Sequence, residues 1–96
     1  MEIAKGDIIQ SKNGRDKGRA LFVIDVEETY LVLVDGKRRR IEQPKRKKVK
    51  HCMFLTRESG RVAEKLQAGE RVANIDVRRA LAAFAAGADH HEPEEE

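Results

Sequence analysis

The chain has 96 residues, which allows one small domain with at most a short appendage. Its single cysteine excludes an intramolecular disulfide and fits a reducing compartment. No apolar stretch approaches the roughly 20 residues that span a bilayer, and no apolar segment follows a basic N-terminal region. We therefore expect a cytoplasmic protein that makes no membrane contact.

Charge is divided unequally along the chain. Residues 1–57 contain 15 Lys and Arg against 8 Asp and Glu, whereas residues 58–96 contain 5 against 9. A basic front half followed by an acidic tail indicates a domain that faces a polyanion. The alternative is that the charges serve solubility alone, but their clustering favours nucleic-acid binding.

The first elements in chain order are strands. Residues 6–11 form a short predicted strand, and a basic loop bounded by Gly14 and Gly18 follows it. Glycine tolerates positive φ, so this loop is expected to turn tightly and to present Arg15 and Lys17. Residues 20–26 and 29–35 are rich in β-branched and apolar residues, and they predict a hairpin.

Turn signals then predict the rest of a small sheet. Asp35-Gly36 predicts a second hairpin, with residues 38–43 as its returning strand. Pro44 cannot donate to a strand ladder, so we expect residues 45–48 to form a loop. Residues 49–55 predict a closing strand. The expected fold is mainly β: a small SH3-like barrel over residues 1–57, followed by a C-terminal α-helical extension.

The C-terminal part has a different character. Residues 58–73 predict a connector with a short helix over 62–67, and residues 74–87 predict the C-terminal helix. Asn74 is the expected N-cap, Asp76 lies in the first turn, and Gly87 is the expected C-cap. Residues 88–96 predict a disordered acidic tail.

The basic cluster is the main functional signal, because nine of the fourteen residues from 37 to 50 are Lys or Arg. An edge strand needs only a few lysines to block aggregation, so nine favour phosphate contacts with a polyanion. Phe22, Tyr30 and Phe54 are expected in the core, which favours structured RNA over unpaired bases. The candidate RNA-binding residues are Lys12, Arg15, Lys17, Arg19, Arg38, Arg40, Lys45, Arg46, Lys47, Lys48 and Lys50.

Catalysis has little support in the sequence. Asp16, Asp25 and Asp35 are expected to accept hydrogen bonds from backbone amides in turns. The adjacent pair His51-Cys52 is unsuited to a nucleophile and its base, because neighbours on a strand point to opposite faces. His90-His91 with the terminal glutamates lacks the fixed geometry of a metal site. We expect no enzyme activity, no cofactor and no metal.

The pattern Lys5-Gly6-Asp7-x-Ile9-x-Ser11-x-x-Gly14-x-x-Lys17-Gly18 is similar to the opening of the KOW motif. With Leu21–Val26, Tyr30–Gly36 and Pro44–His51, residues 1–56 resemble the archaeal and eukaryotic large-subunit ribosomal proteins with a KOW barrel, and their small bacterial relatives. The stretch Asn74–Leu81 looks like the helical extension of the bacterial members. The resemblance implies an SH3-like barrel that binds RNA, often ribosomal RNA. By position, it implies that Arg15, Lys17, Arg19, Lys45 to Lys48 and Lys50 face the RNA.

The sequence thus predicts a protein, monomeric when free, that contacts ribosomal or other structured RNA and associates with the ribosome or its proteins. The alternative is a protein-interaction module of the translation or transcription machinery that uses the SH3-like barrel. DNA binding would share the electrostatics, but no basic helix is suitably placed for the major groove.

Overall fold

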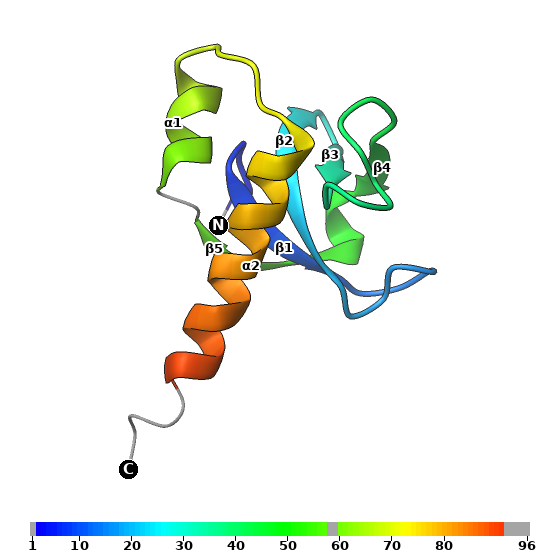
Figure 1. The fold of residues 1–96 in the computed structure, drawn as a ribbon. Helices are drawn as coiled ribbons and strands as arrows, with labels where there is room; N and C mark the ends of the chain where they lie inside the picture. The colour runs from blue at the N-terminus through cyan, green and yellow to red at the C-terminus, as the bar shows by residue number, and fades with distance from the viewer. Residues whose placement is uncertain (1, 58–59, 92–96) are drawn as a thin grey trace.

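The computed structural model describes residues 2–57 and 60–91. Five strands precede two helices, and α2 lies across one face of the sheet (Figure 1). In chain order the elements are β1 (Asp7–Ser11), β2 (Ala20–Glu27), β3 (Tyr30–Val34), β4 (Lys45–Lys48), the 3₁₀ turn η1 (Val49–His51), β5 (Cys52–Arg57), α1 (Arg61–Gln67) and α2 (Asn74–His91).

The strands form one antiparallel sheet in the order β4-β3-β2-β1-β5. The two edge strands, β4 and β5, are consecutive in the chain and are joined only by the three residues of η1. Because so short a link cannot cross a flat sheet, the sheet must curl until its two edges approach each other at this end. The prediction of a mainly β fold with a C-terminal helix is confirmed.

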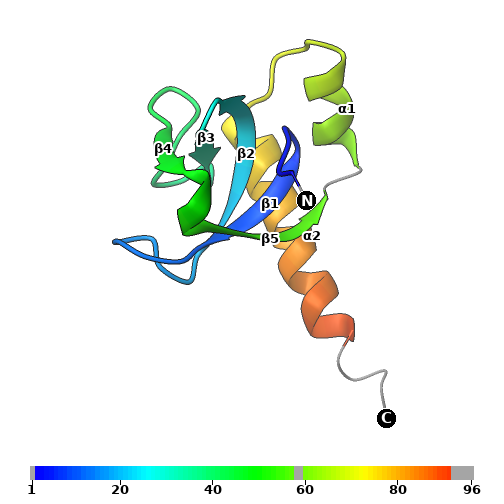
Figure 2. The same ribbon diagram turned by 180° about the vertical axis from the view of Figure 1, so that it is seen from behind.

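Both faces of the sheet are buried. Ile9, Leu21 and Leu33 belong to the core on the inner side of the curl, whereas Ile8 and Phe22 belong to a second core beneath the helices. Figure 2 shows the strands from the side opposite to α2. A strand that is buried on both faces carries a continuous apolar run instead of an alternating one. This explains why the segments that form β1 and β2 show little alternation.

Two predictions for the middle of the chain are wrong, and a third is shifted along the chain. Residues 38–43 form no strand, because the chain leaves β3 through a long loop over residues 35–44. Residues 45–48 are not a loop but the edge strand β4, whose four cations pair with β3. The predicted closing strand begins three residues later than expected, because residues 49–51 form η1. Pro44 is compatible with this arrangement, since it immediately precedes the edge strand.

The short helix over residues 62–67 is confirmed as α1, which ends in a turn with Gly69 at φ +76°. In this turn Glu70 N donates to Lys65 O over 2.8 Å and Gly69 N donates to Leu66 O over 3.2 Å, the pattern of a Schellman motif.

The long helix α2 does not end at Gly87 as expected but continues to residue 91. The remainder of the predicted acidic tail, residues 92–96, lies outside the described residues. Neither described helix is long and apolar enough to cross a membrane.

Candidate nucleic-acid interface

The loop between β1 and β2, residues 12–19, is here named the glycine loop. It is closed by hydrogen bonds from Gly18 N to Ser11 O (2.8 Å) and from Ser11 N to Arg19 O (3.1 Å). Gly14 and Gly18 both have positive φ, at +79° and +84°, as the sequence predicts. Lys12, Arg15, Lys17 and Arg19 are exposed on this loop.

Asn13 connects the glycine loop to β4 and η1. Its side-chain amide lies 2.8 Å from His51 Nδ1, and Lys47 Nζ donates to Asn13 Oδ1 over 3.4 Å and to Asn13 O over 3.3 Å. A backbone hydrogen bond from Lys12 N to His51 O (2.9 Å) lies beside them. The glycine loop is therefore held against the segment that carries the second set of predicted cations. Sequence reasoning missed Asn13 and His51, since neither is charged and the chain separates them by 38 residues.

A second contact connects the glycine loop to the loop over residues 35–44. Asp16 is almost fully buried, and its Oδ2 accepts a hydrogen bond from Arg39 Nη2 at 3.0 Å. The sequence predicts that Asp16, Asp25 and Asp35 accept hydrogen bonds from backbone amides. This is confirmed for Asp25, whose Oδ1 accepts from Val26 N, and for Asp35, whose Oδ1 accepts from Lys37 N and Arg39 N, whereas Asp16 binds a side chain. The adjacent basic residue Arg38 remains exposed.

The basic run of β4 is divided between two faces. Lys47 lies opposite Leu31, so Lys45 and Lys47 are on the inward side of the curled sheet, next to the glycine loop. Arg46 and Lys48 are on the outward side. This alternation separates the four cations more than a loop would and reduces their mutual repulsion.

Two of the eleven predicted cations are already paired. Arg46 lies 2.9 Å from Glu27 and over the ring of Tyr30, with 4.9 Å between Cζ and the ring centroid. Arg40 lies 3.6 Å from Glu42. Within the described residues no carboxylate lies within 4 Å of the other nine, which are Lys12, Arg15, Lys17, Arg19, Arg38, Lys45, Lys47, Lys48 and Lys50. We name these nine the basic surface.

Two residues of the basic surface lie at a cleft that also carries acidic residues. Lys48 and Lys50 line a cleft of about 680 Å³ with the apolar side chains of Ile3, Val26 and Val49. Glu2 and Glu28 lie at the same cleft, so charges of both signs meet there. The residues brought together around the glycine loop are therefore the more uniformly basic part of the predicted set.

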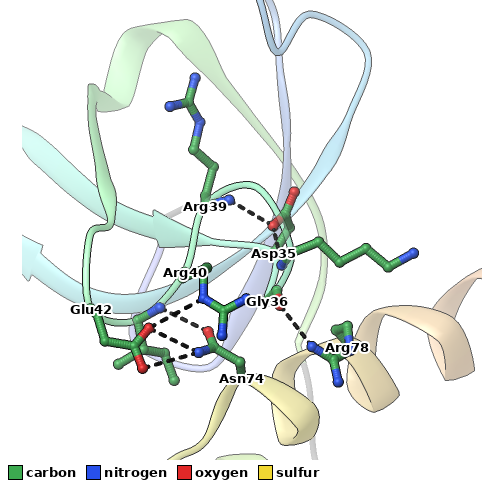
Figure 3. Close-up of polar contacts among 9 residues, drawn as sticks. Asp35, Gly36, Arg39, Arg40, Glu42, Asn74 and Arg78 are labelled. Carbon is green, nitrogen blue, oxygen red and sulfur yellow. Dashed lines mark hydrogen bonds and ion pairs between the residues drawn. The ribbon is translucent and has the colours of Figure 1, made fainter.

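The loop over residues 35–44 is also attached to the start of α2 (Figure 3). Asn74 is not the N-cap that the sequence predicts: its Oδ1 accepts from Ile41 N at 2.8 Å and its Nδ2 donates to Glu42 at 3.0 Å. The hydrogen bond from Asn74 lowers the pKa of the Glu42 carboxyl. Ala73 takes the cap position, and Asp76 Oδ2 accepts from its N–H at 2.9 Å. That bond, together with Lys65, lowers the pKa of Asp76.

The environment of Cys52 is that of a buried core residue. It is buried, its Sγ donates to Lys48 O over 3.4 Å, and burial raises the pKa of its thiol against the opposing effect of Lys47 and Lys12. A thiol with a raised pKa is a poor nucleophile at neutral pH, since the thiolate is the reactive form. In the part of the chain that the structure describes, no group of three or more His, Cys, Asp or Glu could hold a metal ion.

No protein-family model matches the chain, and no curated protein matches it.

Proposed function

We propose that this protein binds structured RNA, with ribosomal RNA as the expected class, through the glycine loop and the cations around it. The observation that supports this most directly is the convergence of three basic segments on one loop. Asn13 joins the glycine loop to Lys47 of β4, and Asp16 joins it to Arg39. These contacts hold basic segments from distant parts of the chain near one another, as recognition of a phosphate backbone by shape requires.

The proposal includes the fold family. A curled antiparallel sheet whose edge strands are joined by a single 3₁₀ turn is the arrangement expected of a partly open SH3-like barrel. This arrangement and the positive φ of the glycines at positions 14 and 18 support the KOW resemblance of residues 1–56. We propose that the protein acts in the cytoplasm as a monomer when free, without enzymatic activity, and associates with the ribosome.

Crosslinking in cells with sequencing of the attached RNA tests this function, together with a sucrose gradient. We expect enrichment of large-subunit ribosomal RNA and the protein in ribosomal fractions. Absence of any enriched RNA, with the protein at the top of the gradient, would refute the proposal.

A second candidate function is a protein-interaction module of the translation or transcription machinery. The observation that favours it is the 680 Å³ cleft, whose walls include Ile3, Val26 and Val49. The two functions differ in their response to salt. RNA affinity should fall by orders of magnitude between about 50 and 200 mM salt if several phosphates are contacted, whereas binding through an apolar cleft should change little.

A further inference from the structure

A second cleft, of about 310 Å³, lies between α2 and the base of the glycine loop. Three cations from three separate segments line it: Arg19 from the glycine loop, Lys37 from the loop over residues 35–44, and Arg78 from α2. Leu81 and Ala82 of α2 form an apolar part of its wall. Lys37 and Arg78 are absent from the set that the sequence predicts.

These three cations are available to a ligand. Among the described residues, none of the three has a carboxylate within 4 Å, whereas Arg39 and Arg57 do. Arg78 is half-buried and its Nη1 donates to Gly36 O at 2.9 Å, which holds the guanidinium in place (Figure 3). A guanidinium has five N–H donors, so this bond leaves others for a second partner.

Asp35 is the one acidic residue among the described residues that line this cleft, and its carboxylate already accepts hydrogen bonds from the backbone. Its Oδ1 accepts hydrogen bonds from Lys37 N at 2.8 Å and from Arg39 N at 2.9 Å. Backbone N–H groups that donate to a carboxylate offset part of its charge. Three cations against one carboxylate leave the cleft with a net positive charge, which favours an anionic ligand.

We propose that this cleft binds a backbone phosphate of the same RNA, so that α2 is part of the interface. The inference rests on the proposed function. Arg19 belongs to both sites, so a strand that contacts the glycine loop can continue into the cleft without leaving the protein surface. The apolar wall formed by Leu81 and Ala82 suits the sugar that adjoins the phosphate.

Fluorescence anisotropy with a labelled RNA hairpin, with a stem of about 20 base pairs, tests the inference across a salt series. The variant is Lys37→Gln with Arg78→Gln, where glutamine retains a donor for Gly36 O. We expect the slope of log Kd against log salt to decrease in magnitude by about 2, and affinity at about 100 mM salt to fall on the order of fiftyfold. Lys37→Gln alone changes an exposed side chain, so it tests the cleft even if Arg78→Gln reduces folding. For this variant the expected slope change is about 1.

The matched control is Arg71→Gln with Arg79→Gln, which removes the same charge from exposed positions that do not line the cleft. We expect this control to change the slope by less than half as much. If both double variants behave alike while Arg15→Ala with Lys17→Ala loses binding, the cleft is not a phosphate site and the proposed function stands. If the wild-type protein does not bind the hairpin or ribosomal RNA at any salt concentration, the proposed function itself is refuted.

Discussion

Gly36 lies where the loop over residues 35–44 touches α2, and replacing it with alanine should destabilise the protein through two separate effects. Its φ is +83°, in which an L-residue costs about 1–2 kcal/mol. A Cβ at this position would also lie 2.6 Å from Asn74 O and 2.7 Å from Arg78 Cγ. Ordinary contact begins near 3.4 Å, so the neighbouring backbone would have to move by about 0.8 Å.

The backbone of α2 cannot make this movement without disturbing packed side chains. The nearer atom belongs to the backbone of α2, and this helix places Val77 and Ala80 in the core beneath it. Forcing an additional carbon into a packed contact costs typically about 1–3 kcal/mol. We therefore expect Gly36→Ala to lower the free energy of unfolding by about 2–5 kcal/mol, the sum of the conformational and the steric contributions.

Gly69→Ala is the matched control, because Gly69 also has positive φ, at +76°, but a Cβ there would meet nothing within 4 Å. It should cost only the conformational term, about 1–2 kcal/mol. Urea unfolding followed by circular dichroism measures both values. Equal destabilisation by the two substitutions would show that the turn at Gly36 does not pack closely against α2, and it would remove the structural basis for the position of Arg78.

Three further predictions concern the site and its supports. Arg15→Ala with Lys17→Ala should decrease the slope of log Kd against log salt for RNA by about 2. It should leave urea unfolding unchanged, because both side chains are exposed. A loss of folding stability as large as the loss of binding would contradict the assignment of this loop. Asp16→Ala should lower the free energy of unfolding by about 1–3 kcal/mol, since it leaves the partly buried Arg39 unpaired. The double variant Asp16→Ala with Arg39→Ala should recover part of this loss. If the effects of the two substitutions are additive instead, the pair is not coupled. Asp76→Asn should destabilise the protein at neutral pH, because folding lowers the pKa of Asp76. The difference in unfolding free energy from wild type should persist above the ordinary pKa of about 4 and vanish as pH falls through the lowered pKa. A difference that does not depend on pH would contradict this origin.

Local sequence was sufficient for much of the sheet and for the glycine loop. The apolar runs that form β2 and β3 predict strands because β-branched and aromatic residues fit a pleated, buried surface. Gly14 and Gly18 predict positive φ because other residues are strained there. The cations of the glycine loop were also identified correctly as exposed, since burying an unpaired charge is costly.

Only the tertiary structure decided the secondary structure of the basic run and the hydrogen-bond partners of Asn74 and Asp16. Lys45–Lys48 has no intrinsic preference for a strand, and it becomes one because β3 offers it an unpaired ladder of backbone groups. Asn74 could have capped its own helix, but the loop over residues 35–44 lies close enough to take its side chain. Contacts such as Asp16 with Arg39 join residues far apart in the chain, and no local pattern encodes such a distance. The sequence by itself determined which residues are apolar, turning or charged, and the packing of the curled sheet against α2 decided which of the charged residues meet.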